Sequence, residues 1–168
     1  MNVNTQVHSF YLKDDGQIPN NPDLPVIVYQ GIFNDNPNGI AETFQRHDWE
    51  GCWTGEVFEY QHYHSNSHEV LGVKSGEATL LLGGDSGERV EVKEGDVVVL
   101  PAGTGHKKVE GSPDFAVIGA YPKGSSSNLL EKDPGSRTQA MHEIRSVPVP
   151  EKDPVYGDEG PLLHKWVK

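Results

Sequence analysis

The chain has 168 residues, 19 of them glycine and 12 proline, and a formal net charge of −11. This length fits one domain with a sizeable core. The acidic balance argues against nucleic acid as a partner, because phosphate backbones are bound by clustered Lys and Arg. The sequence has no long apolar run and no basic leader, so we expect a cytoplasmic protein that does not interact with membranes.

We expect an extended N-terminal arm over residues 1–52. Two of its runs, HSFYLK and VIVYQGIF, are typical of strands, and a turn-rich segment separates them. Residues 38–49, NGIAETFQRHDW, predict a helix capped by Asn38, because Ile40 and Phe44 share a face at i,i+4.

Residues 53–122 alternate short apolar runs with Gly, Pro, Asn and Asp, which predicts an all-β core, a sandwich or a barrel. GEVFEYQHYH, residues 55–64, is the first predicted strand of this core. We expect the remainder, residues 123–168, to form a C-terminal tail. Residues 136–145 predict a short helix, and the Pro- and Gly-rich segment after them is predicted to be non-helical. Its apolar side chains predict packing on the barrel or on a partner subunit, and we expect a homodimer.

The stretch HYHSNSHE, residues 62–69, concentrates groups that bind metals. Side chains alternate along a strand, so His62 and His64 are predicted to share a face. Glu69 follows a turn and opens the next strand, where a hairpin would bring it close to both. His68 is predicted to point away from Glu69, to the surface or behind the site.

A further histidine, His106, follows the segment GDVVVLPAGTG. Together with His62, His64 and Glu69 it provides three imidazoles and one carboxylate, which suit a single divalent transition metal: Fe, Mn, Ni, Zn or Co. This set leaves two positions of an octahedron open for water, a substrate or dioxygen.

These residues resemble the two motifs of the cupin superfamily. His62 to Gly76 resembles the first motif, and Gly95 to His106 resembles the second, with Gly, five residues, Pro-x-Gly, two residues and His. Two positions depart from the pattern: Gly55 precedes His62 by one residue more than usual, and Glu110 replaces a frequent Asn. Neither is a ligand position.

The resemblance implies a double-stranded β-helix, the cupin jelly-roll barrel, with the metal inside one mouth. The arm and tail further resemble a group of small bacterial single-domain cupins, a likeness that implies no activity.

Strand parity adds weaker candidates. Glu56, Phe58 and Tyr60 are predicted to face inward with His62, which makes Glu56 and Tyr60 candidate catalytic residues. Phe58 and Tyr60 are equally compatible with a pocket wall, and Glu56 with an exposed rim. Lys108 shares parity with His106 and is either solvated or poised to bind an anion.

Three functions remain open. The metal could serve an enzyme, such as a dioxygenase, isomerase or decarboxylase, that acts on a small oxygen-rich metabolite. It could serve a binding or sensing module without turnover. It could also simply tie together the strands that carry its ligands. The fold alone does not choose among them.

Overall fold

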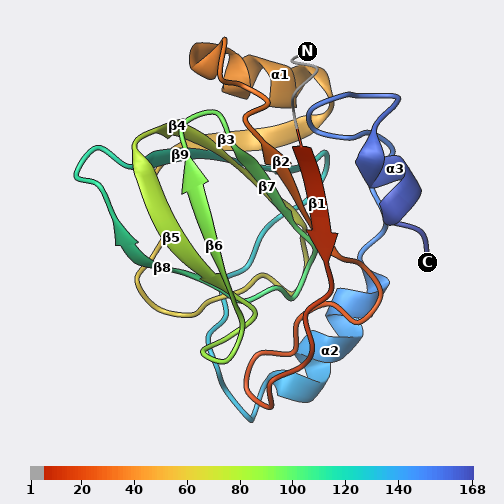
Figure 1. Ribbon diagram of the computed structural model, residues 1–168. Helices are drawn as coiled ribbons and strands as arrows, with labels where there is room; N and C mark the ends of the chain where they lie inside the picture. The colour runs from red at the N-terminus through yellow and green to blue at the C-terminus, as the bar shows by residue number, and fades with distance from the viewer. Residues whose placement is uncertain (1–5) are drawn as a thin grey trace.

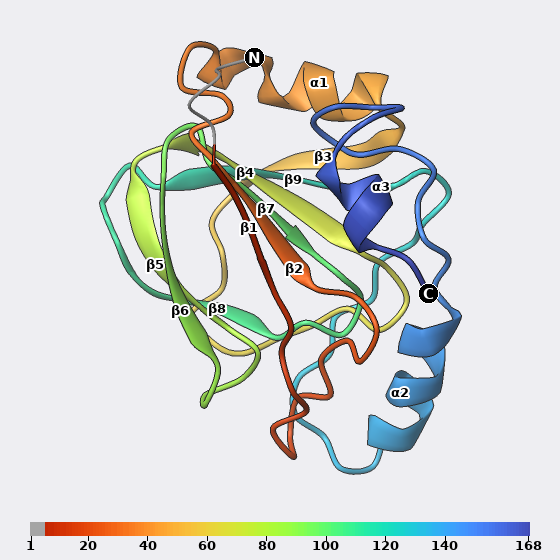
Figure 2. The same cartoon turned by 45° about the vertical axis from the view of Figure 1, so that its right-hand side comes forward.

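The computed structural model describes residues 6–168 and contains two antiparallel sheets with short helices at their margins (Figures 1 and 2). The strands are β1 (Gln6–Phe10), β2 (Val26–Gln30), β3 (Trp49–Gly55), β4 (Glu69–Ser75), β5 (Glu77–Leu82), β6 (Glu88–Lys93), β7 (Val97–Leu100), β8 (His106–Gly111) and β9 (Ala116–Pro122). The helices are the 3-10 helix η1 (Pro37–Gly39), α1 (Ile40–Arg46), α2 (Arg137–Ser146) and α3 (Pro161–Lys165).

The six-stranded sheet has the order β1-β2-β7-β4-β9-β3, and the three-stranded sheet has the order β6-β5-β8. One apolar cluster draws buried side chains from both sheets, among them Leu71 and Val98 from the larger and Leu80 and Leu82 from the smaller. Alternating side chains on strands of both sheets thus share one interior, as in a barrel. The predicted all-β jelly roll is confirmed.

A second core cluster joins the larger sheet to segments outside it. Ile40 and Phe44 of α1, together with Leu162 of α3 and Trp166, pack in the same cluster as Ile27 of β2. Ile40 and Phe44 are fully buried, which confirms the shared face predicted for this helix. The apolar tail therefore packs on its own barrel.

The predicted N-terminal arm is part of the larger sheet. β2 lies between β1 and β7, and four of its five residues are buried. A continuous apolar run such as VIVY is typical of a strand covered on both faces.

The prediction of one strand over residues 55–64 is wrong. β3 pairs with β9 as far as Gly55 opposite Val117, one residue from the start of β9 at Ala116, and the pairing ends there. Residues 56–64 instead cross to the smaller sheet and meet β8 at an isolated bridge between His62 and His106. The register of β3 against β9 shifts between Glu50 and Trp53, before Gly55.

The helices also differ from the prediction in detail. The segment after Asn36 starts as a 3-10 turn, so Asn38 lies inside it and does not cap α1. The helix predicted over residues 136–145 is present as α2. The segment predicted to be non-helical contains α3, whose first residue, Pro161, suits a helix start because its fixed φ is already helical.

Gly103 shapes the turn that leads into His106, and we expect its replacement to be costly. Its φ is 94°, and a Cβ would lie 2.6 Å from Ile144 Cδ1 and 2.8 Å from the Asn20 carbonyl oxygen. Gly103→Ala should lower the free energy of unfolding by about 3 kcal/mol in urea denaturation. Gly124 is a matched control, because its φ is 82° and nothing lies within 4 Å of its Cβ position. An equal loss in Gly124→Ala would mean that the close contacts of Gly103 contribute nothing.

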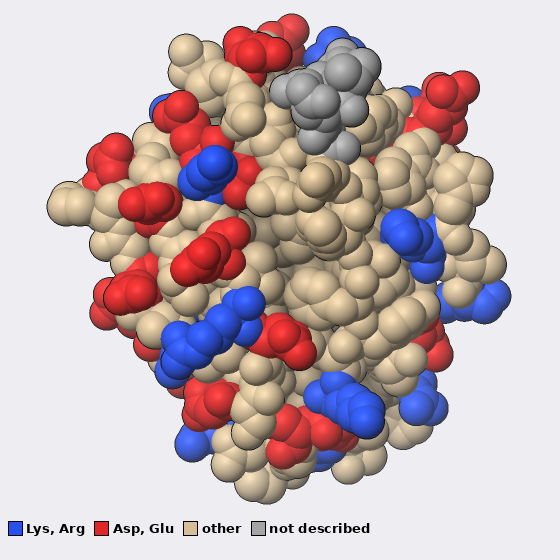
Figure 3. All heavy atoms as spheres, in the orientation of Figure 1, with Lys and Arg blue, Asp and Glu red and all other residues tan. Residues whose placement is uncertain are grey.

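Within residues 6–168, no helix is long and apolar enough to cross a membrane. Figure 3 shows acidic side chains gathered on the side of the molecule that carries β5, β6 and β8, with lysine and arginine side chains between them.

Candidate metal centre

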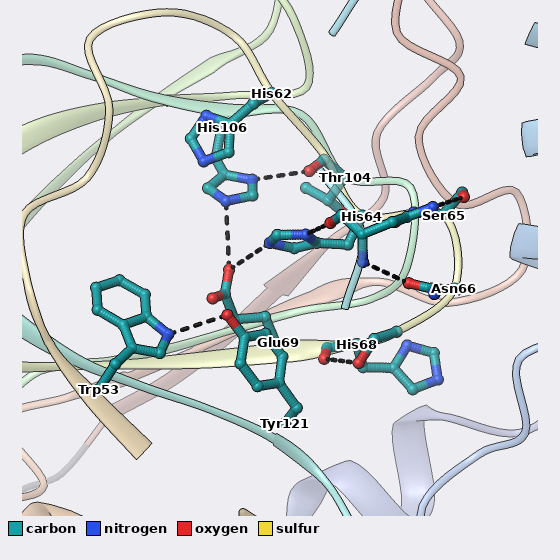
Figure 4. Close-up of polar contacts among 12 residues, drawn as sticks. Trp53, His62, His64, Ser65, Asn66, His68, Glu69, Thr104, His106 and Tyr121 are labelled. Carbon is teal, nitrogen blue, oxygen red and sulfur yellow. Dashed lines mark hydrogen bonds and ion pairs between the residues drawn. The ribbon is translucent and has the colours of Figure 1, made fainter. Parts of the chain in front are cut away.

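The predicted metal ligands come from three segments that meet inside the barrel (Figure 4). His62 and His64 lie on the crossing segment, while Glu69 and His106 are the first residues of β4 and β8. The backbones of His62 and His106 exchange two hydrogen bonds, of 3.2 and 3.0 Å. This bridge brings the two halves of the site together, although the segment that carries His62 is not a regular strand.

Glu69 lies at the middle of the cluster. Its Oε1 is 3.2 Å from His64 Nε2 and 3.3 Å from His106 Nε2. The ligand atoms of these three residues all lie within 4.8 Å of one another. Such a compact group of two imidazoles and a carboxylate, with Glu69 and His106 buried, has the composition of a transition-metal site.

Each of the three histidines turns Nδ1 toward a backbone carbonyl oxygen. The pairs are His62 with Tyr60 (3.0 Å), His64 with Asn128, and His106 with Thr104 (2.9 Å). A carbonyl oxygen only accepts hydrogen bonds, so Nδ1 carries the proton and Nε2 of a neutral ring keeps its lone pair. Nε2 is therefore the nitrogen available to a metal in all three residues.

This arrangement fits a cation. The Nε2 lone pairs of His64 and His106 both face the same carboxylate oxygen of Glu69, and these electron-rich atoms repel one another unless positive charge lies between them. Protons on the two rings could provide that charge. One divalent ion would satisfy both nitrogens and the carboxylate together.

The electrostatics favour the metal-binding forms of Glu69 and His62. Burial opposes ionisation of Glu69, but His106 and His64 outweigh it when they carry a proton on Nε2 and donate it to the carboxylate, and they hold the pKa of this carboxyl well below its usual range. Burial, and then the neighbouring His106, lower the pKa of His62 to about 3. At neutral pH Glu69 is an anion and His62 is neutral, as metal ligands must be.

The electrostatics of His64 differ from those of His62. Burial opposes its protonation, but the adjacent Glu69 carboxylate outweighs burial and raises the pKa of His64. Protonation of His64 and binding of a metal to its Nε2 therefore compete, because a histidine ligand must be neutral.

His62 lies farther from the Glu69 carboxylate group than the other predicted histidine ligands do. It is buried, and its ring centroid lies 4.0 Å from that of His106 and 6.3 Å from that of His64. It lies outside the compact group formed by His64, Glu69 and His106. All four residues line one cavity, but only His64, Glu69 and His106 have their ligand atoms within 4.8 Å of one another.

Sequence reasoning missed Tyr121. Trp53 donates a hydrogen bond from Nε1 to the Tyr121 hydroxyl oxygen at 3.0 Å, and this hydroxyl lies beside the Glu69 carboxylate (Figure 4). Burial, and then the Glu69 charge, raise the pKa of Tyr121 to about 12, so it keeps its proton. The register of β4 against β9 pairs Val70 with Ala120, which sets Tyr121 opposite Glu69. That register has no local sequence signal.

Asn128 is a second residue that the sequence did not reveal. Its side chain accepts a hydrogen bond from the Ser65 backbone N–H at 2.9 Å and donates one to Ser65 Oγ at 2.8 Å. With its carbonyl oxygen also bound to His64 Nδ1, Asn128 fixes the orientation of this histidine. The loop after β9 therefore contributes to the site although it lies more than sixty residues from His64 and Ser65 along the sequence.

His68 points away from Glu69, as predicted, but it is completely buried and therefore not at the surface. Its Nδ1 accepts a hydrogen bond from the Ala102 N–H at 2.8 Å, and its Nε2 lies 3.1 Å from the Pro148 carbonyl oxygen. Its ring packs against Trp166. Burial lowers the pKa of His68 to about 4, so it stays neutral and links the turn before His106 to the tail.

Residues 56–64 do not form the strand whose alternation predicted an inward face for Glu56 and Tyr60. Glu56 nevertheless lines the cavity that also contains the four predicted ligands, whereas Tyr60 does not. Glu56 is exposed, and its carboxylate lies 2.9 Å from Lys108 Nζ. Tyr60 is 41% exposed and stacks on Phe58. Both candidate catalytic residues thus lie at the rim, outside the Glu69 cluster.

Comparison with known proteins identifies the family. Residues 48–109, which include all four predicted ligands, match the model of a family described as "Cupin domain". The chain is also 45% identical over 164 residues to "Uncharacterized protein YjlB" of Bacillus subtilis (strain 168), a match that covers 97% of this chain and 98% of that protein.

Similar solved structures are more distant. Procruciferin from Brassica napus is 18% identical over 80% of this chain and 37% of its own, with a TM-score of 0.42. Acireductone dioxygenase from Bacillus anthracis, which holds a cadmium ion in its active center, is 18% identical over 58% of this chain and 66% of its own, with a TM-score of 0.39. A variant of oxalate decarboxylase from Bacillus subtilis is 20% identical over 74% of this chain and 33% of its own, with a TM-score of 0.38.

The chain thus spans less than two thirds of each of these three structures, and TM-scores this low say nothing of its function. The family match and the nearly full-length similarity to YjlB are sufficient by themselves. The chain belongs to the cupin family.

Proposed function

We propose that this protein binds one divalent transition-metal ion through His62, His64, Glu69 and His106 and uses it to bind a small-molecule ligand. The hydrogen bonds at Nδ1 carry the proposal, because they leave three Nε2 lone pairs available around an anionic carboxylate. His62 is included because its Nε2 is free, its ring is neutral and it lines the same cavity.

A bound metal of this kind supplies Lewis-acid activation and open coordination positions. Chemical transformation of the ligand, as by a dioxygenase, isomerase or decarboxylase, is the candidate function that we favour. It is supported by Tyr121, which holds a proton at its hydroxyl beside Glu69 and lines the cavity. Retention or sensing of a metabolite without turnover is the alternative. Oxygen uptake and product formation against small acids, sugars and diones distinguish the two.

The metal site is tested by the metal content of the purified protein. We expect about one transition-metal ion per chain in the wild type and at least a tenfold lower content in His64→Ala, because loss of a ligand costs more than the ~10–100-fold effect of losing an outer partner. His142→Ala is the matched control, since His142 is exposed on α2. Unchanged metal content in His64→Ala would remove this residue from the ligand set.

We also propose a homodimer in which the arm and tail take part. Tyr11 in the arm and Val167 in the tail are 63% and 65% exposed, which leaves apolar surface at both segments. Light scattering of the purified protein should give twice the mass of the chain, and the mass of one chain would contradict the proposal.

A further inference from the structure

The cavity that contains the predicted metal ligands has an apolar wall. Trp53, Val57, Phe58, Leu71 and Leu129 line it, and its volume is about 310 Å³. Val57 and Leu71 are buried, whereas Phe58 and Leu129 are 48% and 50% exposed and stand toward the solvent. The cavity therefore runs from the buried Glu69 cluster to an opening with apolar sides, and its volume is near the lower limit for small-molecule sites.

Several polar groups along this wall already have partners. The Asn128 side chain bonds Ser65, and the Trp53 indole N–H bonds Tyr121. A ligand rich in hydroxyl groups would lose its hydrogen bonds to water without regaining them from such a wall, which is costly for each group. The wall thus favours a ligand whose body is apolar.

Charge limits the head group of the ligand. A divalent metal with the Glu69 carboxylate would leave a net charge of about +1 in a buried site, and one negative charge on the ligand would neutralise it. Lys108 does not add to this charge, because its ammonium group pairs with Glu56 at 2.9 Å. A dianion would therefore leave uncompensated negative charge in the cavity.

From the wall and the charge we propose that the ligand is a small monoanionic acid with two chelating oxygens at one end and an apolar body, of the 2-oxo acid type. This inference rests on the proposed metal site and narrows its ligand class, which sequence reasoning expected to be oxygen-rich throughout. The two oxygens would occupy the open metal positions, and the body would contact Leu71, Phe58 and Leu129.

The test is a homologous series of 2-oxo acids titrated by calorimetry into Zn²⁺-loaded protein. Pyruvate, 2-oxobutanoate, 2-oxopentanoate and 2-oxohexanoate differ by one methylene each, and full burial of a methylene gives roughly a fourfold gain in affinity. We expect 2-oxohexanoate to bind at least tenfold more tightly than pyruvate, oxalate or gluconate. Equal affinities along the 2-oxo acid series, or tighter binding of oxalate or gluconate than of 2-oxohexanoate, would overturn the proposed ligand class.

Variants of the wall test its role directly. Phe58→Ser and Leu129→Ser change half-exposed side chains, so the fold should tolerate them. Each should weaken 2-oxohexanoate at least threefold and leave pyruvate unchanged. Val109→Ser is the matched control, because Val109 is 38% exposed on β8 and outside the cavity lining. Equal losses for both acids, or none, would show that the wall does not select the ligand body.

The metal content of the same samples separates this inference from the proposed function. If the protein holds no metal, the proposed function fails, and the wall is then tested in metal-free protein by chemical-shift titration with hexanoate and acetate. Tighter binding of hexanoate supports an apolar-bodied ligand. Equal binding of the two overturns it.

Discussion

Glu69→Gln is expected to lower the affinity of the protein for divalent metal by at least about 100-fold, because it removes the only predicted anionic ligand. The amide also has the opposite hydrogen-bonding character. Its N–H groups would donate to the lone pairs of His64 Nε2 and His106 Nε2, which now face Glu69 Oε1 at 3.2 and 3.3 Å. The variant therefore forms a neutral hydrogen-bonded network in which both Nε2 lone pairs are already occupied, so a cation gains no free ligand atoms there.

Competition with a chromogenic chelator measures this affinity, and Glu42→Gln is the matched control, since Glu42 is exposed on α1. Thermal melting gives an independent readout. Metal at about 100 times its dissociation constant should stabilise the wild type by about 2.7 kcal/mol and leave Glu69→Gln unaffected. Wild-type affinity in Glu69→Gln would show that the ion binds elsewhere.

Asp153→Ala is expected to cause the largest loss of stability, about 3–5 kcal/mol in the free energy of unfolding. The Asp153 carboxyl group is completely buried and accepts hydrogen bonds from the backbone N–H groups of Val155 (2.8 Å), Tyr156 (3.1 Å) and Leu162 (3.1 Å). It also accepts one from the Tyr29 hydroxyl. Truncation leaves these donors without partners in the core beneath the tail.

Chemical denaturation of the variant and of two controls checks this prediction. Asp158→Ala changes an exposed carboxylate near Lys152 and should alter stability by less than about 0.5 kcal/mol. Asp153→Asn keeps one acceptor oxygen but turns an N–H group toward the donors, so its loss should be intermediate. A loss below about 1 kcal/mol in Asp153→Ala would mean that the tail does not depend on this residue.

The motif spacing was enough to predict that His64, Glu69 and His106 come together, because residue type and spacing are local properties of HYHSNSHE and of the segment before His106. The route by which they meet was not predictable in the same way. The parity argument for Glu56 and Tyr60 required a strand over residues 55–64, but β3 ends at Gly55, opposite Val117 near the start of β9.

Tyr121 and Asn128 show a further limit. Tyr121 comes to Glu69 through the register of β4 against β9, and Asn128 comes to His64 through a loop. Neither position has a residue pattern that distinguishes it from an ordinary strand end or loop. Such partners depend on tertiary pairing, so composition and spacing cannot reveal them.

A crystal structure of the metal-loaded protein, with anomalous scattering at the absorption edge of the metal, tests the proposed centre most directly. We predict one ion bonded to Nε2 of His62, His64 and His106 and to a carboxylate oxygen of Glu69, at about 2.0–2.2 Å. An ion bound through Nδ1, or at a site away from Glu69, would contradict the proposal.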